Sequence, residues 1–317
     1  MTWNIKEVDR VEILTLQDNY FDALSGDSNA IVSRALPIKD MEVKNTILAE
    51  HGFSALVTVY AGGRSRSLLF DFGFSEFGAA FNADTLDVDL TPVEALVLSH
   101  GHLDHAGGLN KLVEMTGRAD LPLYVHPAAF RNPRYIKLSE DLKFNFPAFT
   151  REKADDAGVK LTVTEDPVLL LDDTVLFLGD IPRRTDFEKG APNFFYREND
   201  EEQWDPIDDD TGIAMRVKGQ GLVVLSGCAH AGIINTVEHA KDLTGENNVY
   251  AVMGGFHLTG PAMAPLIEPT LAGLKEIAPR YIVPTHCTGR AAVQAIELAF
   301  PDGFLLNMAG TKMTFAA

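Results

Sequence analysis

Three imidazoles and one carboxylate lie within residues 100–105, whose sequence is HGHLDH. The segment comes directly after an apolar run that predicts a buried strand. Imidazole nitrogens and carboxylate oxygens are ligands that suit zinc, iron or manganese. His100 and His102 can direct two nitrogens at one cation, while Asp104 and His105 face a second one. The motif therefore predicts a metal site, and specifically a two-metal site; the alternative is a solvated histidine-rich loop.

Two further histidines are candidate metal ligands, because each follows an apolar strand within a glycine-containing turn. His230 lies in SGCAHAG and His286 lies in THCTG. Two metals need about seven or eight protein contacts plus a bridging water, so we expect both residues to be ligands; a buried, hydrogen-bonded histidine is the alternative. Asp180 or Cys228 could bridge the two cations. We favour a supporting role for each, in which it orients a ligand without touching metal.

Several other side chains are candidates for the surroundings of the site. Asp71 in LLFDFG either caps a turn or is a buried carboxylate that orients the histidine loop. His257 follows a Gly-Gly pair, which suits close approach of the backbone to a ligand, so we expect it to bind substrate rather than metal. His51 and His126 lie at strand ends from which they could reach the cleft. His239 lies among charged residues of a predicted helix, which favours a solvated face.

The composition is that of a globular protein with a sizeable core, since 46% of the 317 residues are hydrophobic. The chain is long enough for one large α/β domain or two smaller ones. No run of eighteen apolar residues occurs and residues 1–10 lack the features of a secretory signal, so we expect a cytoplasmic protein that does not enter a membrane. The two cysteines, Cys228 and Cys287, lie in histidine-bearing motifs and are expected to be reduced thiols.

The formal net charge of −18, from 45 acidic and 27 basic residues, should repel nucleic acid and anionic lipid over most of the surface. A small-molecule substrate is therefore expected, with no nucleic-acid partner; a homo-oligomer is left open. Bound cations can reverse the potential locally, so a phosphorylated substrate is compatible with this charge. Arg183 and Arg184 could contact a phosphate, because the guanidinium group matches its geometry; solvated loop charges are the alternative.

Strands and helices alternate along most of the chain, and the predicted strands end where the candidate histidines begin. The first three strands are spaced like a β-meander. Because sites in α/β proteins assemble at the carboxyl ends of strands, we expect the histidines to converge there. Strands are predicted at 11–20, 49–63, 65–73, 93–98, 121–126, 161–163, 174–178, 212–219, 221–227, 248–253 and 280–283, and helices at 105–115, 232–243 and 269–277.

Two segments, 127–160 and 183–210, do not fit this alternation. The first carries scattered aromatic and basic residues, and we expect a helical or irregular insertion rather than a part of the core sheet. The second is too long and acidic for a simple turn. Each is either mobile surface or a lid that brings aromatic side chains to the pocket.

The order of these motifs resembles that of the metallo-β-lactamase-fold hydrolases, and the resemblance spans nearly the whole chain. It rests on LLFDFG, SHGHLDHAGG, a histidine in the second half, and PTHCTG near the end. LQDNY, AEHGFSALV, GDIPRRTDFE, SGCAHAGIIN and GGFHL further resemble a subgroup whose archaeal members are associated with a step of methanopterin synthesis. That step is catalysed by a 7,8-dihydropterin-6-methyl-4-(β-D-ribofuranosyl)aminobenzene 5'-phosphate synthase.

The resemblance implies a single domain over residues 1–317 with an α/β fold, a four-layer αββα sandwich. It also implies a dinuclear site between the two sheets, for which zinc is the expected metal and iron or manganese are alternatives. By position, His100 and His102 belong to the first metal, and Asp104, His105 and His286 belong to the second.

One departure from the family pattern concerns the ligand that bridges the metals. Hydrolases of the hydroxyacylglutathione type place a histidine and then a bridging aspartate on successive strands of the second half. Here the corresponding strands end in Gly179–Arg183 and Ser226–His230. The pattern predicts a looser second metal site and leaves a transferase open besides a hydrolase.

The leading functional hypothesis is a dinuclear-metal hydrolase that acts on a small, phosphorylated or pterin-like molecule through a metal-activated water. Asp104 would bind metal and orient the water or accept its proton. One alternative is a transferase that joins a dihydropterin diphosphate to ribofuranosylaminobenzene 5'-phosphate with release of diphosphate. Another is a protein of the same fold that binds a metabolite without catalysis.

Overall fold

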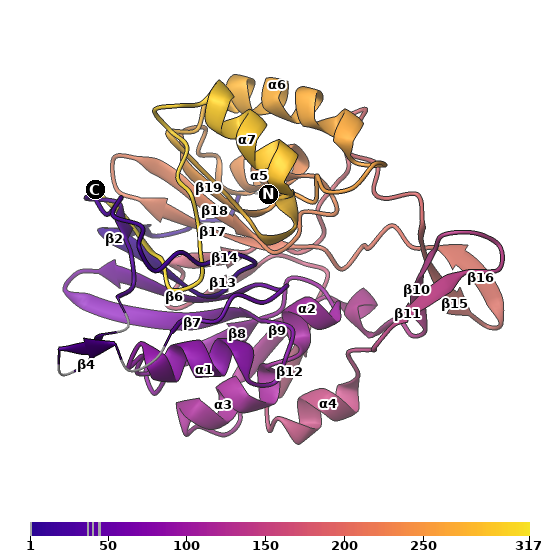
Figure 1. The fold of residues 1–317 in the computed structure, drawn as a ribbon, viewed down its shortest axis with the longest axis horizontal. Helices are drawn as coiled ribbons and strands as arrows, with labels where there is room; N and C mark the ends of the chain where they lie inside the picture. The colour runs from indigo at the N-terminus through magenta and orange to yellow at the C-terminus, as the bar shows by residue number, and fades with distance from the viewer. Residues whose placement is uncertain (1, 37, 40, 44–45) are drawn as a thin grey trace.

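Two β-sheets pack face to face at the centre of the molecule, and helices cover the outer face of each (Figure 1). The computed structural model describes residues 2–36, 38–39, 41–43 and 46–317. Apolar side chains from both sheets fill the space between them, and two further apolar clusters lie between each sheet and its helices. The predicted four-layer αββα sandwich is therefore confirmed.

The first sheet has eight strands and contains the predicted meander, in which β2, β6 and β7 pair antiparallel. The strands β8, β9 and β12 then add in parallel. Across the sheet the strands are β12 (Lys160–Val163), β9 (Pro122–Val125), β8 (Val93–Val97), β7 (Arg64–Phe72), β6 (Ser54–Ala61), β2 (Arg10–Gln17), β21 (Lys312–Ala316) and β3 (Val32–Ser33).

The second sheet has seven strands, and its strands β18, β19 and β20 run parallel to one another. They are near-continuous apolar runs because both faces of the sheet are covered. Across the sheet the strands are β13 (Val168–Leu170), β14 (Val175–Phe177), β17 (Gly212–Val217), β18 (Gly221–Ser226), β19 (Val249–Gly255) and β20 (Tyr281–Thr285), with β1 (Glu7–Val8) paired to β17.

Three longer helices pack on each sheet through an apolar face, while the remaining elements are short. Residues 105–115 were predicted as one helix but belong to two, which are separated at Gly107. The backbone of Gly107 packs so closely on Phe74 that a Cβ at this position would lie 1.7 Å from the Phe74 carbonyl oxygen. The first sheet carries α1 (Gly78–Thr85), α3 (Leu109–Thr116) and α4 (Arg151–Asp156), and the second carries α5 (Ile233–Thr244), α6 (Ile267–Ile277) and α7 (Arg290–Ala299). The short elements are α2 (Leu103–Ala106), η1 (Pro127–Phe130), η2 (Ala264–Leu266), η3 (His286–Thr288) and the hairpin of β4 (Ile38–Lys39) and β5 (Glu42–Val43).

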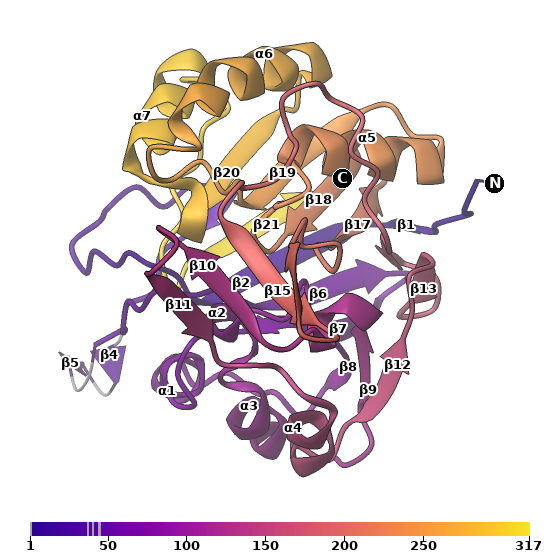
Figure 2. The same cartoon turned by 90° about the vertical axis from the view of Figure 1, so that its right-hand side faces the viewer.

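The two insertions pair with each other to form a separate four-stranded antiparallel sheet, which we call the lid sheet. Its order is β11 (Lys143–Phe146), β10 (Arg134–Lys137), β15 (Phe194–Glu198) and β16 (Glu201–Trp204). It projects from the sandwich in Figure 1 and faces the viewer in Figure 2. The expected helical or irregular conformation of the first insertion is wrong for this hairpin, because its partner strand β15 lies more than fifty residues away and leaves no local signal.

No helix in the described part of the chain combines the length and apolar character needed to cross a membrane.

Candidate metal centre

Four strand ends from the two facing sheets bring the predicted histidines together. β8 ends three residues before His100, and β18 ends four residues before His230. β19 ends two residues before His257, and His286 follows β20 directly. Residues from positions 100 to 286 therefore meet at one edge of the sandwich, as the strand pattern predicted.

The first group of potential ligands consists of His100, Cys228 and His230, whose ligand atoms all lie within 4.8 Å of one another. Nδ1 of His102 lies 3.0 Å from Nε2 of His100, close to the separation of about 3.3 Å that follows for two nitrogens on one tetrahedral zinc. Both ring nitrogens of His230 and Nε2 of His102 are buried without a hydrogen-bond partner. Buried polar atoms are rarely left unpaired, and a cation in this group would satisfy one nitrogen of the His230 ring.

The second group consists of Asp104, His105, Cys228 and His286, again with all ligand atoms within 4.8 Å. Nε2 of His286 lies 3.2 Å from Oδ2 of Asp104, and Nε2 of His105 lies 3.0 Å from Sγ of Cys228. Asp104 Oδ2 also lies 3.4 Å from Nε2 of His51, whose side chain is 60% exposed. The second group is therefore the more accessible of the two.

Asp71 holds the histidine loop from behind. The residue is fully buried, and its carboxylate accepts hydrogen bonds from Nδ1 of His105 at 2.6 Å and from the backbone N–H and hydroxyl of Ser99 at 2.7 and 2.8 Å. A carboxylate on the far nitrogen of a ligating histidine sets its tautomer and its orientation. In the structure, Nε2 of His105 is thereby directed at the second group.

The backbone is strained at the strand ends that carry the candidate ligands. Ala229, His257 and His286 have φ values of 46°, 46° and 43°, in the left-handed region that residues with a Cβ seldom adopt. Such strain costs on the order of 1–3 kcal/mol per residue and concentrates at functional sites.

Burial and neighbouring charges determine the protonation of the cluster. Burial lowers the pKa of His100 and His230 well below the usual range and lowers that of His102 to about 4. These rings are therefore neutral at pH 7, as metal binding requires. Burial also opposes charge on His105, but two neighbouring carboxylates outweigh it and raise its pKa to about 9. Burial would raise the pKa of Asp104, yet His105 and hydrogen bonds from two other histidines hold it well below its usual range.

A buried ion pair that the sequence analysis missed connects the lid sheet to the histidine loop. Asp209 is fully buried and accepts a hydrogen bond of 2.7 Å from the backbone N–H of Gly101. Arg134 on β10, 4% exposed, donates to the same carboxylate and also lies 2.8 Å from Asp205. The run of three aspartates before β17 was the available signal, but only the fold shows that one of them contacts the loop.

Other residues that the sequence analysis missed surround His286. Asp18 accepts from its backbone N–H at 2.9 Å, and the side chain of Asn19 lies 2.9 Å from its Nδ1. Both belong to the LQDNY segment. A cavity of about 470 Å³, lined in part by Tyr20 and Arg290, opens beside His286. Substrate could therefore approach from this side.

Two phenylalanines of the lid sheet cover the first group. The rings of Phe146 and Phe194 lie 5.0 and 5.6 Å from the ring of His102, measured between centroids. Phe194 also lies 5.7 Å from His230 and 6.0 Å from His257. The aromatic lid residues considered in the sequence analysis thus reach the cluster from a distance in the chain.

Several predicted site residues lie outside the two groups. Asp180 pairs with His126 at 2.5 Å and its side chain is 60% exposed, so it does not contact the histidine loop. Arg183 donates to the carbonyl of Pro206, and Arg184 pairs with Asp242 on the surface. These two arginines are therefore already engaged by protein groups.

The predicted environment of His239 differs from what is observed. His239 is buried, and its Nε2 lies 3.1 Å from the carbonyl oxygen of Leu178, so the expectation of a solvated face was wrong: α5 packs this side against the second sheet. His257 groups with Cys228 and Cys287, with ligand atoms within 4.8 Å of one another, and its role in substrate binding stays a prediction.

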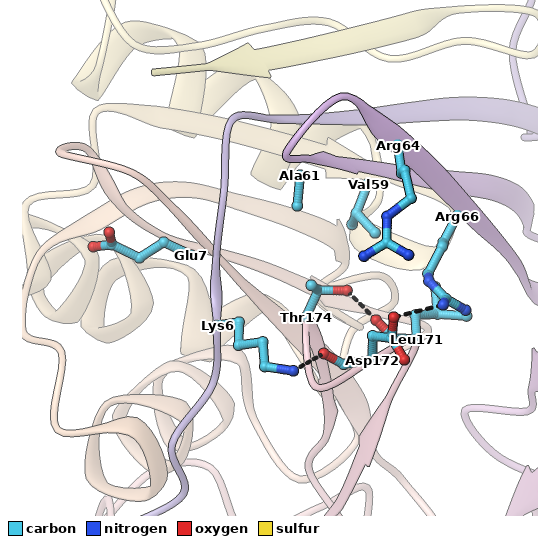
Figure 3. A pocket seen from close by; sticks show the side chains of 9 residues that line it. All are labelled: Lys6, Glu7, Val59, Ala61, Arg64, Arg66, Leu171, Asp172 and Thr174. Carbon is cyan, nitrogen blue, oxygen red and sulfur yellow. Dashed lines mark hydrogen bonds and ion pairs between the residues drawn. The ribbon is translucent and has the colours of Figure 1, made fainter.

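A separate cavity of about 130 Å³ lies between the β6–β7 hairpin, the β13–β14 turn and the N-terminal segment (Figure 3). Two of its cations are engaged by protein: Lys6 donates to the carbonyl of Asp172 at 3.0 Å, and Arg66 pairs with the Asp172 carboxylate at 2.5 Å. The described residues that line it include no histidine or cysteine. The described lining of this cavity therefore offers none of the imidazole or thiol donors that the histidine cluster brings together.

Comparisons with known proteins agree with the fold and the motif order. The family model described as metallo-beta-lactamase superfamily matches residues 51–243. A 7,8-dihydropterin-6-methyl-4-(beta-D-ribofuranosyl)-aminobenzene-5'-phosphate synthase of Methanocaldococcus jannaschii is 28% identical over 99% of this chain and 100% of its own length. An uncharacterized protein of the same archaeon is 30% identical over 78% of this chain and 88% of its own length.

Solved structures show the same architecture. A metal-dependent hydrolase of the beta-lactamase superfamily is similar at a TM-score of 0.73 with 26% identity, covering 97% of this chain and 100% of that one. A diphosphatase of the PhnP family is similar at a TM-score of 0.51 with 12% identity, covering 96% and 98%.

Proposed function

Because the chain belongs to the metallo-β-lactamase superfamily, we propose that it is a metal-dependent hydrolase acting on a small, phosphorylated or pterin-like molecule. The observation that carries the proposal is the meeting of two ligand groups, rich in buried histidine, at one edge of the sandwich. A diphosphatase with the same fold supports phosphorylated substrates as a class to test.

In this proposal each metal has its own set of ligands. His100, His102 and His230 hold one cation, and Asp104, His105 and His286 hold the other. The buried ring of His230, neither of whose nitrogens has a partner among the described residues, supports the first set, since a cation would satisfy one of them. Zinc is the expected metal, with iron or manganese as alternatives.

Two divalent cations would supply a water of lowered pKa and a positive charge for the oxyanion of the substrate. The residues of the chain do the rest. The carboxylate of Asp104 would orient the attacking water by a hydrogen bond and accept its proton. Phe146 and Phe194 exclude bulk water from the first group. His257 lies beside Phe194, where it can contact a bound substrate.

The second candidate is a transferase that joins a dihydropterin diphosphate to ribofuranosylaminobenzene 5'-phosphate and releases diphosphate. The full-length 28% identity to the archaeal synthase favours it. The same residues would serve, because a leaving diphosphate needs the same positive charge as a hydrolysed phosphate. The two candidates differ in whether water or the aminobenzene compound attacks.

The test is turnover by metal-loaded protein of phosphomonoesters, phosphodiesters, diphosphates, lactones and the pterin–aminobenzene pair. Release of phosphate or ring-opened product without coupling supports the hydrolase, and a coupled product with diphosphate supports the transferase. His102→Ala and Asp104→Ala should each lose activity, while His239→Gln on α5, a histidine outside both groups, should keep it. No turnover of any substrate at full metal loading would leave a metabolite-binding protein as the better account. Full activity in both site variants would refute the assignment of the activity to these two groups.

A further inference from the structure

We propose that the thiolate of Cys228 is a ligand shared by the two cations, in the place where related hydrolases use an aspartate. The inference rests on the proposed function in assuming two metals, but it concerns this residue alone. The chain lacks an aspartate in the expected sequence position, and the structure places a sulfur between the two groups instead.

Cys228 is the one residue that both ligand groups contain. The first joins it to His100 and His230, and the second joins it to Asp104, His105 and His286. Its Sγ lies 3.0 Å from Nε2 of His105, shorter than the separation of about 3.6 Å that zinc–nitrogen and zinc–sulfur bond lengths give for two ligands on one tetrahedral ion. A small movement of the imidazole would therefore admit a cation between these atoms.

The carboxylates near the groups do not compete for this position. Among the described residues, the candidate groups contain a single carboxylate, that of Asp104, and it belongs to the second group alone. Asp180 points to His126 and solvent. Asp209 is engaged by Arg134 and Gly101. Asp210 accepts from the backbone N–H of Ala231 through Oδ2; its Oδ1 is buried and unpaired among the described residues, but the residue belongs to none of the candidate groups.

The local structure holds the sulfur in this place. A Cβ on Gly227 would lie 2.0 Å from Oγ of Ser99, so glycine lets the end of β18 approach the start of the histidine loop. Ser226 then accepts a hydrogen bond of 3.1 Å from the backbone N–H of Ala229, which closes a tight turn around Cys228. The residue is 2% exposed.

The step that forms the ligand is a proton loss without any redox change: the Cys228 thiol releases its proton to solvent as its sulfur binds the cations. A thiolate is a softer donor than a carboxylate. It therefore biases the centre towards zinc, iron or cobalt and away from manganese.

Cobalt(II) provides the test, because a thiolate bound to it gives a near-ultraviolet charge-transfer absorption that nitrogen and oxygen ligands do not. Apoprotein is titrated with cobalt, bound metal is measured by elemental analysis, and folding is checked by circular dichroism. The variants are Cys228→Ser, Cys228→Asp and the matched control Cys287→Ser. Cys287 is also buried at the end of a neighbouring strand and belongs to neither of the two groups, but it shares a third group of potential ligands with Cys228 and His257. Loss of the absorption in Cys287→Ser would therefore overturn the assignment of the thiolate to Cys228 alone.

We expect the absorption in the wild type and in Cys287→Ser, and its loss in Cys228→Ser. Cys228→Asp should bind two cobalt ions without the absorption, because a carboxylate can bridge them. His230→Ala and His286→Ala, each of which removes a ligand from one group only, should bind one cobalt ion and keep the absorption.

Sharing is refuted if the absorption disappears in either His230→Ala or His286→Ala, because Cys228 would then serve one cation. Ligation is refuted if Cys228→Ser keeps the absorption, or if wild type fully loaded with cobalt lacks it. An active, metal-loaded wild type without the absorption would overturn this inference and leave the proposed function intact. A wild type that binds no divalent metal would overturn both.

Discussion

The ion pair between Arg134 and Asp209 predicts a large and specific effect of Arg134→Met. Both side chains are almost fully buried, and among the described residues Asp209 keeps only the N–H of Gly101 as a hydrogen-bond partner once the guanidinium group is removed. Asp205 is less affected, since Arg131 still pairs with it at 3.2 Å. The variant therefore leaves the Asp209 carboxylate buried and without a compensating charge.

Removal of one partner from a buried ion pair costs about 3–5 kcal/mol of folding free energy. We expect Arg134→Met to lower the free energy of unfolding at pH 7 by this amount. Adding Asp209→Asn to the same protein should restore about 2 kcal/mol, because the uncompensated charge is removed while the amide oxygen can still accept from Gly101. If Arg134→Met acted only through lost packing, adding Asp209→Asn would not raise the stability of the variant.

The sign of the pH dependence provides a further check. In the wild type, burial alone would raise the pKa of Asp209, but Arg134 outweighs it and holds that pKa far below its usual range. The stabilisation is thus present above the unfolded-state value of 3.8 and is lost as the pH falls through the lower folded-state value. The difference between wild type and Arg134→Met should therefore shrink below about pH 4.

Urea unfolding of metal-free protein, followed by circular dichroism, measures these differences without contributions from metal binding. The reasoning is refuted if Arg134→Met costs less than about 1 kcal/mol, or if the double variant is no more stable than the single one. Cobalt or zinc titration of the folded variants then tells whether the lid sheet also affects the loop between His100 and His102.

Three other predictions concern stability and the metal centre. Burial raises the pKa of Glu188 to about 7 from 4.5, so the folded protein holds a proton there that the unfolded chain releases. The free energy of unfolding should fall by up to about 3 kcal/mol as the pH rises from 4.5 to 7, and Glu188→Gln should abolish this pH dependence. The same pH dependence in urea unfolding of both proteins would contradict the prediction. Phe194→Ala uncovers His102 and His230, so a chromogenic chelator should extract metal from it faster than from the wild type, and equal stopped-flow rates would disprove the role of the lid sheet. Metal removal should lower the melting temperature in calorimetry, because bound metal at a hundred times its dissociation constant adds about 2.7 kcal/mol; an unchanged melting temperature would argue against a tightly held ion in the folded state.

Local sequence was sufficient for the elements with strong apolar patterns. The runs that became β8, β18, β19 and β20 are rich in apolar residues because both faces of their sheets are covered. When parallel strands are buried in this way, the residues that follow them lie close together at the same edge of the sheet. The predicted convergence of histidines at one edge followed from that constraint.

Elements that depend on distant partners were not predicted. β10 pairs with β15 of the other insertion, and β21 at the C-terminus pairs with β2 near the N-terminus. For these strands the stabilising contact is far away in the chain, so the local pattern carries little information about it. The helix α7 also lay outside the predicted elements, although its apolar face packs on the second sheet.

The sequence by itself determined the kind of chemistry at the centre, because the donor atoms in HGHLDH and the histidines after the apolar strands are properties of residue type and order. Only the tertiary structure decided which atoms share a site. It placed Cys228 between both groups, engaged Asp180 elsewhere and connected Arg134 of the lid sheet to the histidine loop. The physical reason is that distances between ligand atoms depend on how two separate sheets pack and how their last residues turn, and a difference of a few ångströms there separates a ligand from a bystander.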